Sequence, residues 1–299
     1  MKKKVTQNTV IFDGKGFARR WEEELKNDID AIGGKLSLGV IVVGENPASL
    51  VYVNVKRQIA ERLGVKFVTA KFQTPGNKQI ENTKLTIINQ IQKWNGDKKI
   101  SGFLVQLPLP DQLRDLQSYL MSLIDREKDV DGLGSSAAVQ PAVVRGLGEI
   151  IGQNPNIVNS KAKVTVVGSG FVAARVAEYF AKSYQLSVAR KVGLRTVAGK
   201  DSQLAKYCRE ADVIISCVGR AGLITGGMVR QGVAVFDLGT MPVEQNHKSQ
   251  ISNYKLTGDV DFGTVAPRAS FITPVPGGIG PVTVSALFAN LLDLAKNSE

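Results

Sequence analysis

The sequence predicts an α/β protein made of two alternating α/β domains with a cleft between them. Its 299 residues suffice for two domains, each with a core of its own. Apolar runs typical of buried strands alternate with helical patterns in both halves of the chain. This alternation predicts parallel sheets with right-handed crossovers. Between the halves, the small and polar segment 134–141 is suited to a hinge.

The best-defined element of the first half is a helix over residues 47–63. It follows the apolar run 36–43, which is typical of a buried strand. Asn46 is a suitable N-cap, and Pro47 is well placed at the first helical position. Gly64 is a natural stop. A helix that opens from the end of a strand in this way places its first turns at the edge where ligands of α/β sheets bind.

The remaining expected elements continue the same alternation, and the second half resembles a nucleotide-binding Rossmann domain. Pro and Gly residues are dense at 272–283, which predicts an irregular loop there. We expect the last helix to pack on the first domain. In order, the other elements are a helix at 17–32, a strand at 65–72, a helix at 80–94, a strand from Ile100, a helix at 142–152, a strand at 163–168, a helix at 171–183, a strand at 186–189, a helix at 202–208, strands at 212–218 and 233–238, and the helix to Ala295.

Composition narrows the class of protein. Hydrophobic residues make up 43% and charged residues 22%, as in a globular protein. The net charge of +11 raises nucleic acid as a partner, but the Lys and Arg residues are dispersed and no recognition motif is present, so no nucleic acid is expected. No apolar run approaches the roughly 20 residues of a membrane span, and the N-terminal segment 1–7 lacks the apolar core of a secretory signal behind its charges. A cytoplasmic location without membrane attachment is the expectation.

Metal chemistry is not expected. The single histidine, His247, lies in a polar loop, which argues against a histidine triad or a zinc site. Cys208 and Cys217 do not have the spacing of metal ligands, and a reducing compartment disfavours a disulfide between them.

Tyr52 and Lys56 form the first candidate site. They lie four residues apart on the predicted helix and so share one face. An aromatic ring can stack on a flat substrate, and an amine beside it can move a proton. The alternative is a solvated lysine next to a half-buried tyrosine, which is the more common arrangement for an isolated pair.

Several motifs together resemble one family along nearly the whole chain. The resemblance is to the methylenetetrahydrofolate dehydrogenase/cyclohydrolase family (FolD). It is carried by Tyr52-Val-Asn-Val-Lys56, Gly102-Phe-Leu-Val-Gln-Leu-Pro-Leu-Pro110, Lys128-Asp-Val-Asp-Gly132, Ala211-Asp-Val-Ile-Ile-Ser-Cys-Val-Gly219, Gly258-Asp-Val-Asp-Phe262 and Thr273-Pro-Val-Pro-Gly-Gly-Ile-Gly-Pro281.

The resemblance implies two reactions. A hydride passes from 5,10-methylenetetrahydrofolate to NAD(P)⁺, and water then opens the resulting methenyl cation to 10-formyltetrahydrofolate. It implies that Lys56 moves protons with a lowered pKa, that Gln106 holds Lys56, and that Tyr52 stacks on the folate. Asp131 would bind the pterin, with Asp129 as the nearby alternative. Backbone at Pro276, Gly277 and Gly278 would approach the ligand closely.

The cofactor side departs from the family pattern. The turn that usually reads Gly-Arg-Ser is Gly168-Ser169-Gly170 here, which is a weak dinucleotide fingerprint. Thr240 is a further candidate for cofactor binding. Arg190 and Lys191 follow the predicted strand 186–189, where NAD enzymes usually place a carboxylate. Two cations there favour the 2′-phosphate of NADP over NAD; the alternative is that both merely solvate a loop. Arg175 is either a further phosphate contact or a surface residue.

The expected domains are a folate-binding catalytic domain, 1–141 plus 282–299, and a Rossmann-like NAD(P)-binding domain, 142–281. The leading interpretation is a bifunctional enzyme, and the resemblance suggests a homodimer. The alternative is a cyclohydrolase whose dehydrogenase activity is weak or lost, because the altered residues all lie in the cofactor half.

Overall fold

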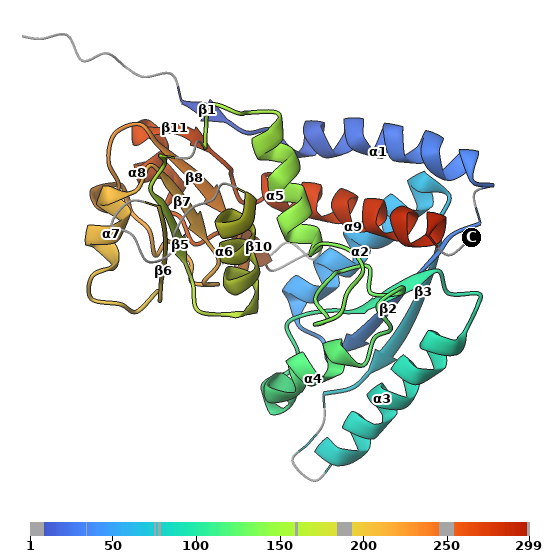
Figure 1. The fold of residues 1–299 in the computed structure, drawn as a ribbon. Coiled ribbons are helices and arrows are strands. Elements are labelled where there is room, and N and C mark those ends of the chain that lie inside the picture. The colour runs from blue at the N-terminus through green and yellow to red at the C-terminus, as the bar shows by residue number, and fades with distance from the viewer. Residues whose placement is uncertain are drawn as a thin grey trace, which may run out of the picture. The chain divides into compact units, whose positions relative to one another are not determined.

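The computed structural model divides the chain into two compact units (Figure 1). It describes residues 9–33, 35–74, 76, 79–158, 161–183, 193–244 and 254–297. Unit 1 comprises the described part of residues 1–17 and 146–282, and unit 2 comprises the described part of 18–145 and 283–299. The divisions fall inside three helices, which are α1 (Gly14–Ala31), α5 (Ala142–Gly152) and α9 (Ile279–Lys296).

Unit 2 is built on a three-stranded parallel sheet in the order β3 (Lys66–Phe72), β2 (Ser37–Val43) and β4 (Gly102–Val105). Every residue of the central strand β2 is buried. Alternate residues of β2 pack into a core shared with α2 and α9, while Trp94 of α3 (Ile80–Gly96) packs edge-on against Phe103 of β4. Burial on both faces explains why β2 and β4 are apolar runs, whereas the edge strand β3 is partly exposed and carries Lys66 and Lys71.

Helix α2 (Pro47–Leu63) has the predicted bounds. The side chain of Asn46 accepts a hydrogen bond from the backbone N–H of Ser49, and Gly64 ends the helix in the left-handed conformation with φ 72°. After β4, the chain forms a 3₁₀ turn (Asp111–Leu116) and then α4 (Gln117–Ser122). Tyr52 and Lys56 therefore lie on a helix whose ends are both fixed by local chemistry.

Helix α9 returns the chain to unit 2, as expected, but it begins earlier than predicted. Its first residue is Ile279, so the expected irregular loop 272–283 is partly helical. Pro281 is compatible with this because the first turn of a helix does not need its backbone N–H groups. α9 is long and apolar enough to be considered as a membrane span, yet 67% of it is buried within the protein, as in a core helix.

Unit 1 contains, among its described residues, a six-stranded sheet in which every neighbouring pair is parallel. In Figure 1 its strands lie side by side, with α6 (Phe171–Ser183) packed on β5 and β6. The chain reverses its winding direction between β5 and β7, which is where ligands bind in such sheets. The strand order is β1 (Val10–Ile11), β11 (Ala269–Ile272), β8 (Val233–Asp237), β7 (Val213–Ser216), β5 (Val164–Val167) and β6 (Leu194–Val197).

Short elements surround this sheet. They are α7 (Leu204–Glu210), a 3₁₀ turn (Gly226–Met228), an antiparallel hairpin of β9 (Met241–Glu244) and β10 (Tyr254–Thr257), α8 (Phe262–Val265) and a 3₁₀ turn (Ala266–Arg268).

Three sequence expectations differ from this arrangement. The predicted strand 186–189 lies outside the described residues, and the strand that pairs with β5 on its outer side is Leu194–Val197. The described residues up to Phe17 belong to unit 1 rather than to unit 2, because β1 pairs with β11. The segment 134–141, expected as a hinge, belongs wholly to unit 2. Pairing between the two ends of a chain leaves no local signal in the sequence.

Candidate active site

Lys56 is buried on α2, with 7% of its surface exposed. Its Nζ donates a hydrogen bond of 2.8 Å to Oε1 of Gln106. Burial lowers the pKa of the amine from its ordinary value, and the nearby carboxylate of Asp131 opposes this shift. The structure therefore excludes the alternative of a solvated lysine.

Gln106 is fixed in the orientation that this contact needs. It follows β4 directly, and its backbone N–H donates to the carbonyl oxygen of Ile41 in β2. The side-chain Nε2 donates to the carbonyl oxygen of Leu107 at 2.7 Å, which leaves Oε1 to accept from Lys56. The sequence predicted this hydrogen bond between Gln106 and Lys56, and it is present.

Asp131 lies beside Lys56 on the loop that follows α4. Its side chain is half-buried, and its backbone carbonyl accepts from Ala142 at the start of α5. Burial raises the pKa of Asp131, while the charge of Lys56 opposes the rise. The amine and the carboxyl group are thus electrostatically coupled, each in a setting that disfavours its charged form.

Asp129 has a different environment, which separates the two carboxylates of the Lys128-Asp-Val-Asp-Gly132 motif. It is 1% exposed, and its two oxygens accept the backbone N–H groups of Gly132 and Gly134 at 3.0 and 2.6 Å. Burial raises its pKa to about 6. Asp129 therefore holds its own loop together, and Asp131 is the carboxylate that faces the amine.

Lys128 also has a structural role, which the sequence did not reveal. Its Nζ donates to three backbone carbonyl oxygens, those of Trp94, Asp97 and Ile100, at 3.1, 2.7 and 3.0 Å. These carbonyls lie at the end of α3 and in the turn before β4, where helix termini leave acceptors unsatisfied. A lysine within a charged motif gives no sequence signal that distinguishes a cap of this kind from a ligand contact.

Tyr52 lies one turn before Lys56 on the same helix. Its ring is half-buried and packs against the core of unit 2. The half-exposed ring, the buried amine and Asp131 come from two segments that the fold of unit 2 brings together. Such a set can stack a flat ligand, accept hydrogen bonds from it and transfer a proton next to it.

In unit 1, the turn Gly168–Gly170 joins β5 to α6. Gly168 has φ 145°, and a Cβ atom there would lie 2.9 Å from the carbonyl oxygen of Cys217, which follows β7. Only glycine fits this close approach of two strand ends. Ser169 and Gly170 are exposed at the start of α6, so their backbone is open to a phosphate group.

Of the other candidate residues for binding cofactor and ligand, some lie in the part of the chain that the structure describes and some do not. Arg190 and Lys191 lie outside the described residues. Thr240, half-buried, follows β8, and Pro276, Gly277 and Gly278 lie in unit 1 between β11 and α9.

Arg175 is engaged by its own helix. Its guanidinium pairs with Glu178 at 3.2 Å and lies over the ring of Phe171 at 5.0 Å. Of the two alternatives that the sequence left open, these contacts favour a surface residue.

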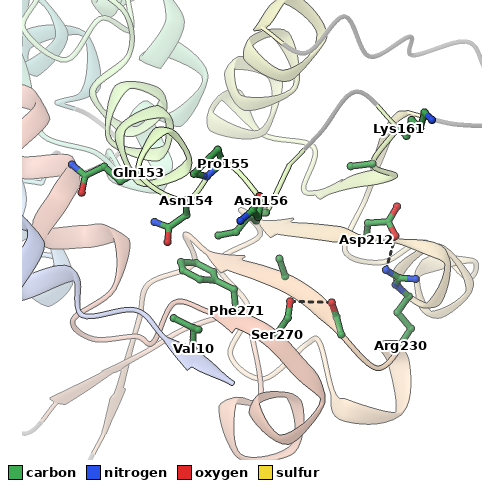
Figure 2. A pocket seen from close by; sticks show the side chains of 14 residues that line it. Val10, Gln153, Asn154, Pro155, Asn156, Lys161, Asp212, Arg230, Ser270 and Phe271 are labelled. Carbon is green, nitrogen blue, oxygen red and sulfur yellow. Dashed lines mark hydrogen bonds and ion pairs between the residues drawn. The ribbon is translucent and has the colours of Figure 1, made fainter. Parts of the chain in front are cut away.

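One cavity of about 660 Å³ lies at the amino ends of the unit 1 strands, opposite to the carboxyl ends where Gly168 lies. Figure 2 shows its wall, in which Asp212 and Arg230 form an ion pair across from the carboxamides of Asn154 and Asn156. Asp212 immediately precedes β7, so this cavity lies at the amino end of that strand. Ligands of doubly wound sheets bind at the carboxyl ends of the strands, and we therefore do not assign this cavity to the binding of substrate or cofactor.

Comparison with known families gives a match over nearly the whole chain. Residues 12–131 match the family model described as "Tetrahydrofolate dehydrogenase/cyclohydrolase, catalytic domain", and residues 140–299 match "Tetrahydrofolate dehydrogenase/cyclohydrolase, NAD(P)-binding domain". The chain belongs to the tetrahydrofolate dehydrogenase/cyclohydrolase family. The first model covers the Lys56–Gln106–Asp131 cluster, and the second covers most of unit 1.

Individual members of the tetrahydrofolate dehydrogenase/cyclohydrolase family match from end to end. The bifunctional protein FolD of Methanospirillum hungatei is 34% identical, over 96% of this chain and 98% of the relative. The FolD structure of Trypanosoma brucei, complexed with NADP cofactor and inhibitor, has a TM-score of 0.85 at 28% identity, covering 97% of this chain and 98% of that one. The Campylobacter jejuni enzyme has a TM-score of 0.79 at 28% identity, covering 97% and 100%.

Proposed function

We propose that this protein catalyses both reactions of its family, with Lys56 as the proton-transfer group of the hydrolysis. The first reaction oxidises 5,10-methylenetetrahydrofolate to the methenyl cation with NADP⁺. The second hydrolyses that cation to 10-formyltetrahydrofolate. The observation that carries the proposal is the buried amine of Lys56, hydrogen-bonded to Gln106 and coupled to Asp131.

In the hydrolysis, water adds to the methenyl carbon and loses a proton, which gives a neutral carbinol. N5 then takes up a proton, the bond from that carbon to N5 breaks, and the hydroxyl group loses its proton as the formyl C=O forms. The overall reaction releases one proton. Burial lowers the pKa of the Lys56 amine, so its proton is released more readily than that of an exposed lysine, and Lys56 can accept a proton from the water and donate one to N5. Gln106 holds the amine in position, Tyr52 stacks on the pterin, and Asp131 accepts hydrogen bonds from its N–H groups.

For the oxidation, unit 1 offers a turn that suits a dinucleotide. The fit rests on Gly168, whose missing side chain allows the start of α6 to lie against the end of β7. When bound there, NADP⁺ supplies the acceptor for the hydride. Ser169 and Gly170 present backbone groups to the phosphates, and Pro276, Gly277 and Gly278 allow close approach of the backbone to the ligand.

The preference for NADP over NAD is expected to depend on cations after the second strand. Because that strand is Leu194–Val197, the residues at its carboxyl end are 198–201. Lys200 is exposed there, while Asp201 accepts the backbone N–H of Gln203 at 2.7 Å and so turns toward α7. Lys200 is therefore a candidate for the 2′-phosphate, whereas Arg190 and Lys191 precede this strand and are candidates from the sequence alone.

Replacing these cations should change cofactor choice. Lys200→Ala and the double variant Arg190→Ala/Lys191→Ala should each raise the KM for NADP about tenfold and leave the KM for NAD nearly unchanged, because only NADP carries the extra phosphate. Initial rates with both cofactors measure this. Lys206→Ala on α7, also exposed, is the matched control. A wild-type protein that reduces NAD as efficiently as NADP would contradict the prediction.

A cyclohydrolase with weak or lost dehydrogenase activity is the second candidate. It is favoured by the altered turn, in which Ser169 stands where the family usually has arginine, and by Arg175, which is held by Glu178. A protein that hydrolyses methenyltetrahydrofolate but reduces neither cofactor would establish it.

We also propose that the protein acts in the cytoplasm as a homodimer. The family resemblance supports the dimer. So does the edge strand β1, where Val10 and Ile11 are 54% and 56% exposed. Light scattering coupled to gel filtration should give twice the mass of one chain. Val10→Lys/Ile11→Lys tests the contribution of β1, since like charges on an apolar edge disfavour association.

A further inference from the structure

Two carboxylates, Asp237 and Asp259, are buried at the carboxyl edge of the unit 1 sheet. They are 3% and 0% exposed. Asp237 is the last residue of β8, and Asp259 lies just after β10. Burying a carboxylate is costly unless its oxygens are hydrogen-bonded, so these contacts indicate what the pair does.

Asp259 holds the segment that follows β7. Its Oδ2 accepts the hydroxyl of Ser216 and the backbone N–H of Val218, both at 2.7 Å, and its Oδ1 accepts the backbone N–H of Arg220 at 2.7 Å. Three donors from one strand end therefore converge on a single carboxylate. Cys217, within this segment, is the residue whose carbonyl faces Gly168.

Asp237 holds the segment after β8 and joins it to Asp259. Its Oδ1 accepts the backbone N–H groups of Gly239 and Asp259 at 2.9 and 3.1 Å, and its Oδ2 accepts that of Val260 at 2.9 Å. Its own backbone N–H donates to the hydroxyl of Thr273, at the start of the Pro- and Gly-rich loop, at 2.8 Å. Asp237 thus connects the segments at Gly239 and at Asp259 through its carboxylate, and reaches the loop at Thr273 through its backbone N–H.

Glycines make this arrangement possible. A Cβ atom on Gly239 would overlap the carboxylate of Asp259, and one on Gly258 would overlap the carboxylate of Asp237. Asp237 also lines a cavity of about 620 Å³ together with Thr273 and Val275. The two carboxylates therefore shape the edge of the sheet at which doubly wound folds bind their cofactors.

We propose that Asp237 and Asp259 are positioning residues for the cofactor, which hold the segments after β7 and β8 in the conformation that binds NADP. The proposal rests on the dehydrogenase activity proposed above. Neither residue needs to touch the cofactor, because each acts through backbone N–H groups of the segments that do.

The surroundings of Asp237 should make its hold on these segments, and so NADP binding, depend on pH. Burial raises its pKa to about 7, the charge of Asp259 adds to the rise, and the bound N–H groups oppose it. The groups that face it are Asp259, Asp261 in the cavity wall and the Cys217 thiol, whose own pKa is raised by burial. A protonated oxygen cannot accept a hydrogen bond along its O–H direction, so protonation releases an N–H group and loosens the held segments.

Stability and cofactor affinity should then respond to pH in opposite directions. Because the folded pKa of Asp237 exceeds the unfolded value of 3.8, the folded state binds more protons between the two values. The contribution of Asp237 to stability therefore falls as pH rises from about 4 to about 7. Over the upper part of that range, its ionisation strengthens NADP binding. A role in stability alone would not produce this opposition.

Calorimetric titration of the full chain with NADP⁺ from pH 5.5 to 8.5 tests the proposal. Asp237→Asn should bind NADP⁺ about tenfold more weakly than wild type at pH 8 and almost equally at pH 5.5. The 2′-phosphate itself titrates near pH 6, so the comparison with Asp237→Asn at each pH isolates the carboxylate. Asp259→Asn should bind about tenfold more weakly throughout. Both should raise the KM for NADP and leave kcat and the KM for methylenetetrahydrofolate nearly unchanged.

Three controls separate positioning from unfolding. Asp212→Asn removes a carboxylate that accepts the backbone N–H of Lys163 at 2.7 Å, at the other edge of the same sheet, and should leave NADP⁺ affinity unchanged. Ser216→Ala removes only the hydroxyl donor and should weaken binding about threefold. Methenyl hydrolysis, which depends on unit 2, should stay within twofold of wild type in every variant and so reports that unit 2 is folded.

The outcomes are distinct. If the wild-type protein binds NADP⁺, and the affinities of Asp237→Asn, Asp259→Asn and Ser216→Ala are all within twofold of the wild-type affinity, this inference alone is overturned. If Ser216→Ala loses both hydrolysis and NADP⁺ binding, the inference is also overturned, since the effect of the substitution is then global. A wild-type protein that does not bind NADP⁺ at all would overturn the dehydrogenase function and, with it, this inference.

Discussion

Replacing Lys56 by methionine should reduce methenyltetrahydrofolate hydrolysis at least a hundredfold while folate binding is retained. General acid–base groups typically supply at least about 10²-fold, and Lys56 is the buried amine of the cluster. Methionine keeps the apolar stem and removes a charge that burial disfavours, so the fold should persist. The decay of methenyl absorbance measures the rate, and fluorescence titration measures binding.

The matched control is Lys66→Met on β3, where the lysine is exposed. Its hydrolysis rate should equal that of wild type. The pH profile of the wild-type rate should report a group whose pKa lies below the ordinary 10.5 of lysine, and this group should be missing from the residual profile of Lys56→Met. Hydrolysis by Lys56→Met within a factor of about three of wild type would exclude Lys56 from proton transfer.

The two aspartates of the Lys128-Asp-Val-Asp-Gly132 motif should respond differently to alanine. Asp131→Ala should raise the KM for folate tenfold or more with little change in stability. The substitution leaves N–H donors of the bound pterin without an acceptor, which costs about 1–3 kcal/mol of binding free energy. Asp129→Ala should instead destabilise the fold by about 2 kcal/mol, since the N–H groups of Gly132 and Gly134 lose their acceptor.

Kinetics combined with denaturant unfolding distinguish the two roles. If Asp131→Ala leaves both kcat and KM unchanged, pterin recognition must be assigned to another residue. If Asp129→Ala is as stable as wild type but does not bind folate, the roles of the two aspartates are reversed.

Local chemistry explains which elements the sequence predicted well. Helix α2 has the predicted bounds because Asn46, Pro47 and Gly64 each impose a backbone conformation on their own position. The strands β2 and β8 were predicted to within one residue because both are short apolar runs in a buried sheet. Spacing on a helix also sufficed to place Tyr52 and Lys56 on one face.

Interactions between distant segments explain what the sequence could not reveal. The pairing of β1 with β11 joins residues some 260 positions apart, so nothing near Val10 indicates its unit. The second strand of unit 1 was predicted at 186–189 from its apolar residues, whereas Leu194–Val197 is the segment that pairs with β5. The different roles of Asp129 and Asp131, and the buried contacts of Asp237 and Asp259, depend on which backbone N–H groups the fold brings to each carboxylate.

A single assay of the purified protein tests most directly whether one chain carries both reactions. Methenyltetrahydrofolate decay and NADPH formation from methylenetetrahydrofolate are followed as two separate absorbances. We expect both signals in wild type, and loss of the hydrolysis signal in Lys56→Met. Methenyl decay without reduction of either NADP or NAD would leave only the cyclohydrolase, and absence of both signals would contradict the account as a whole.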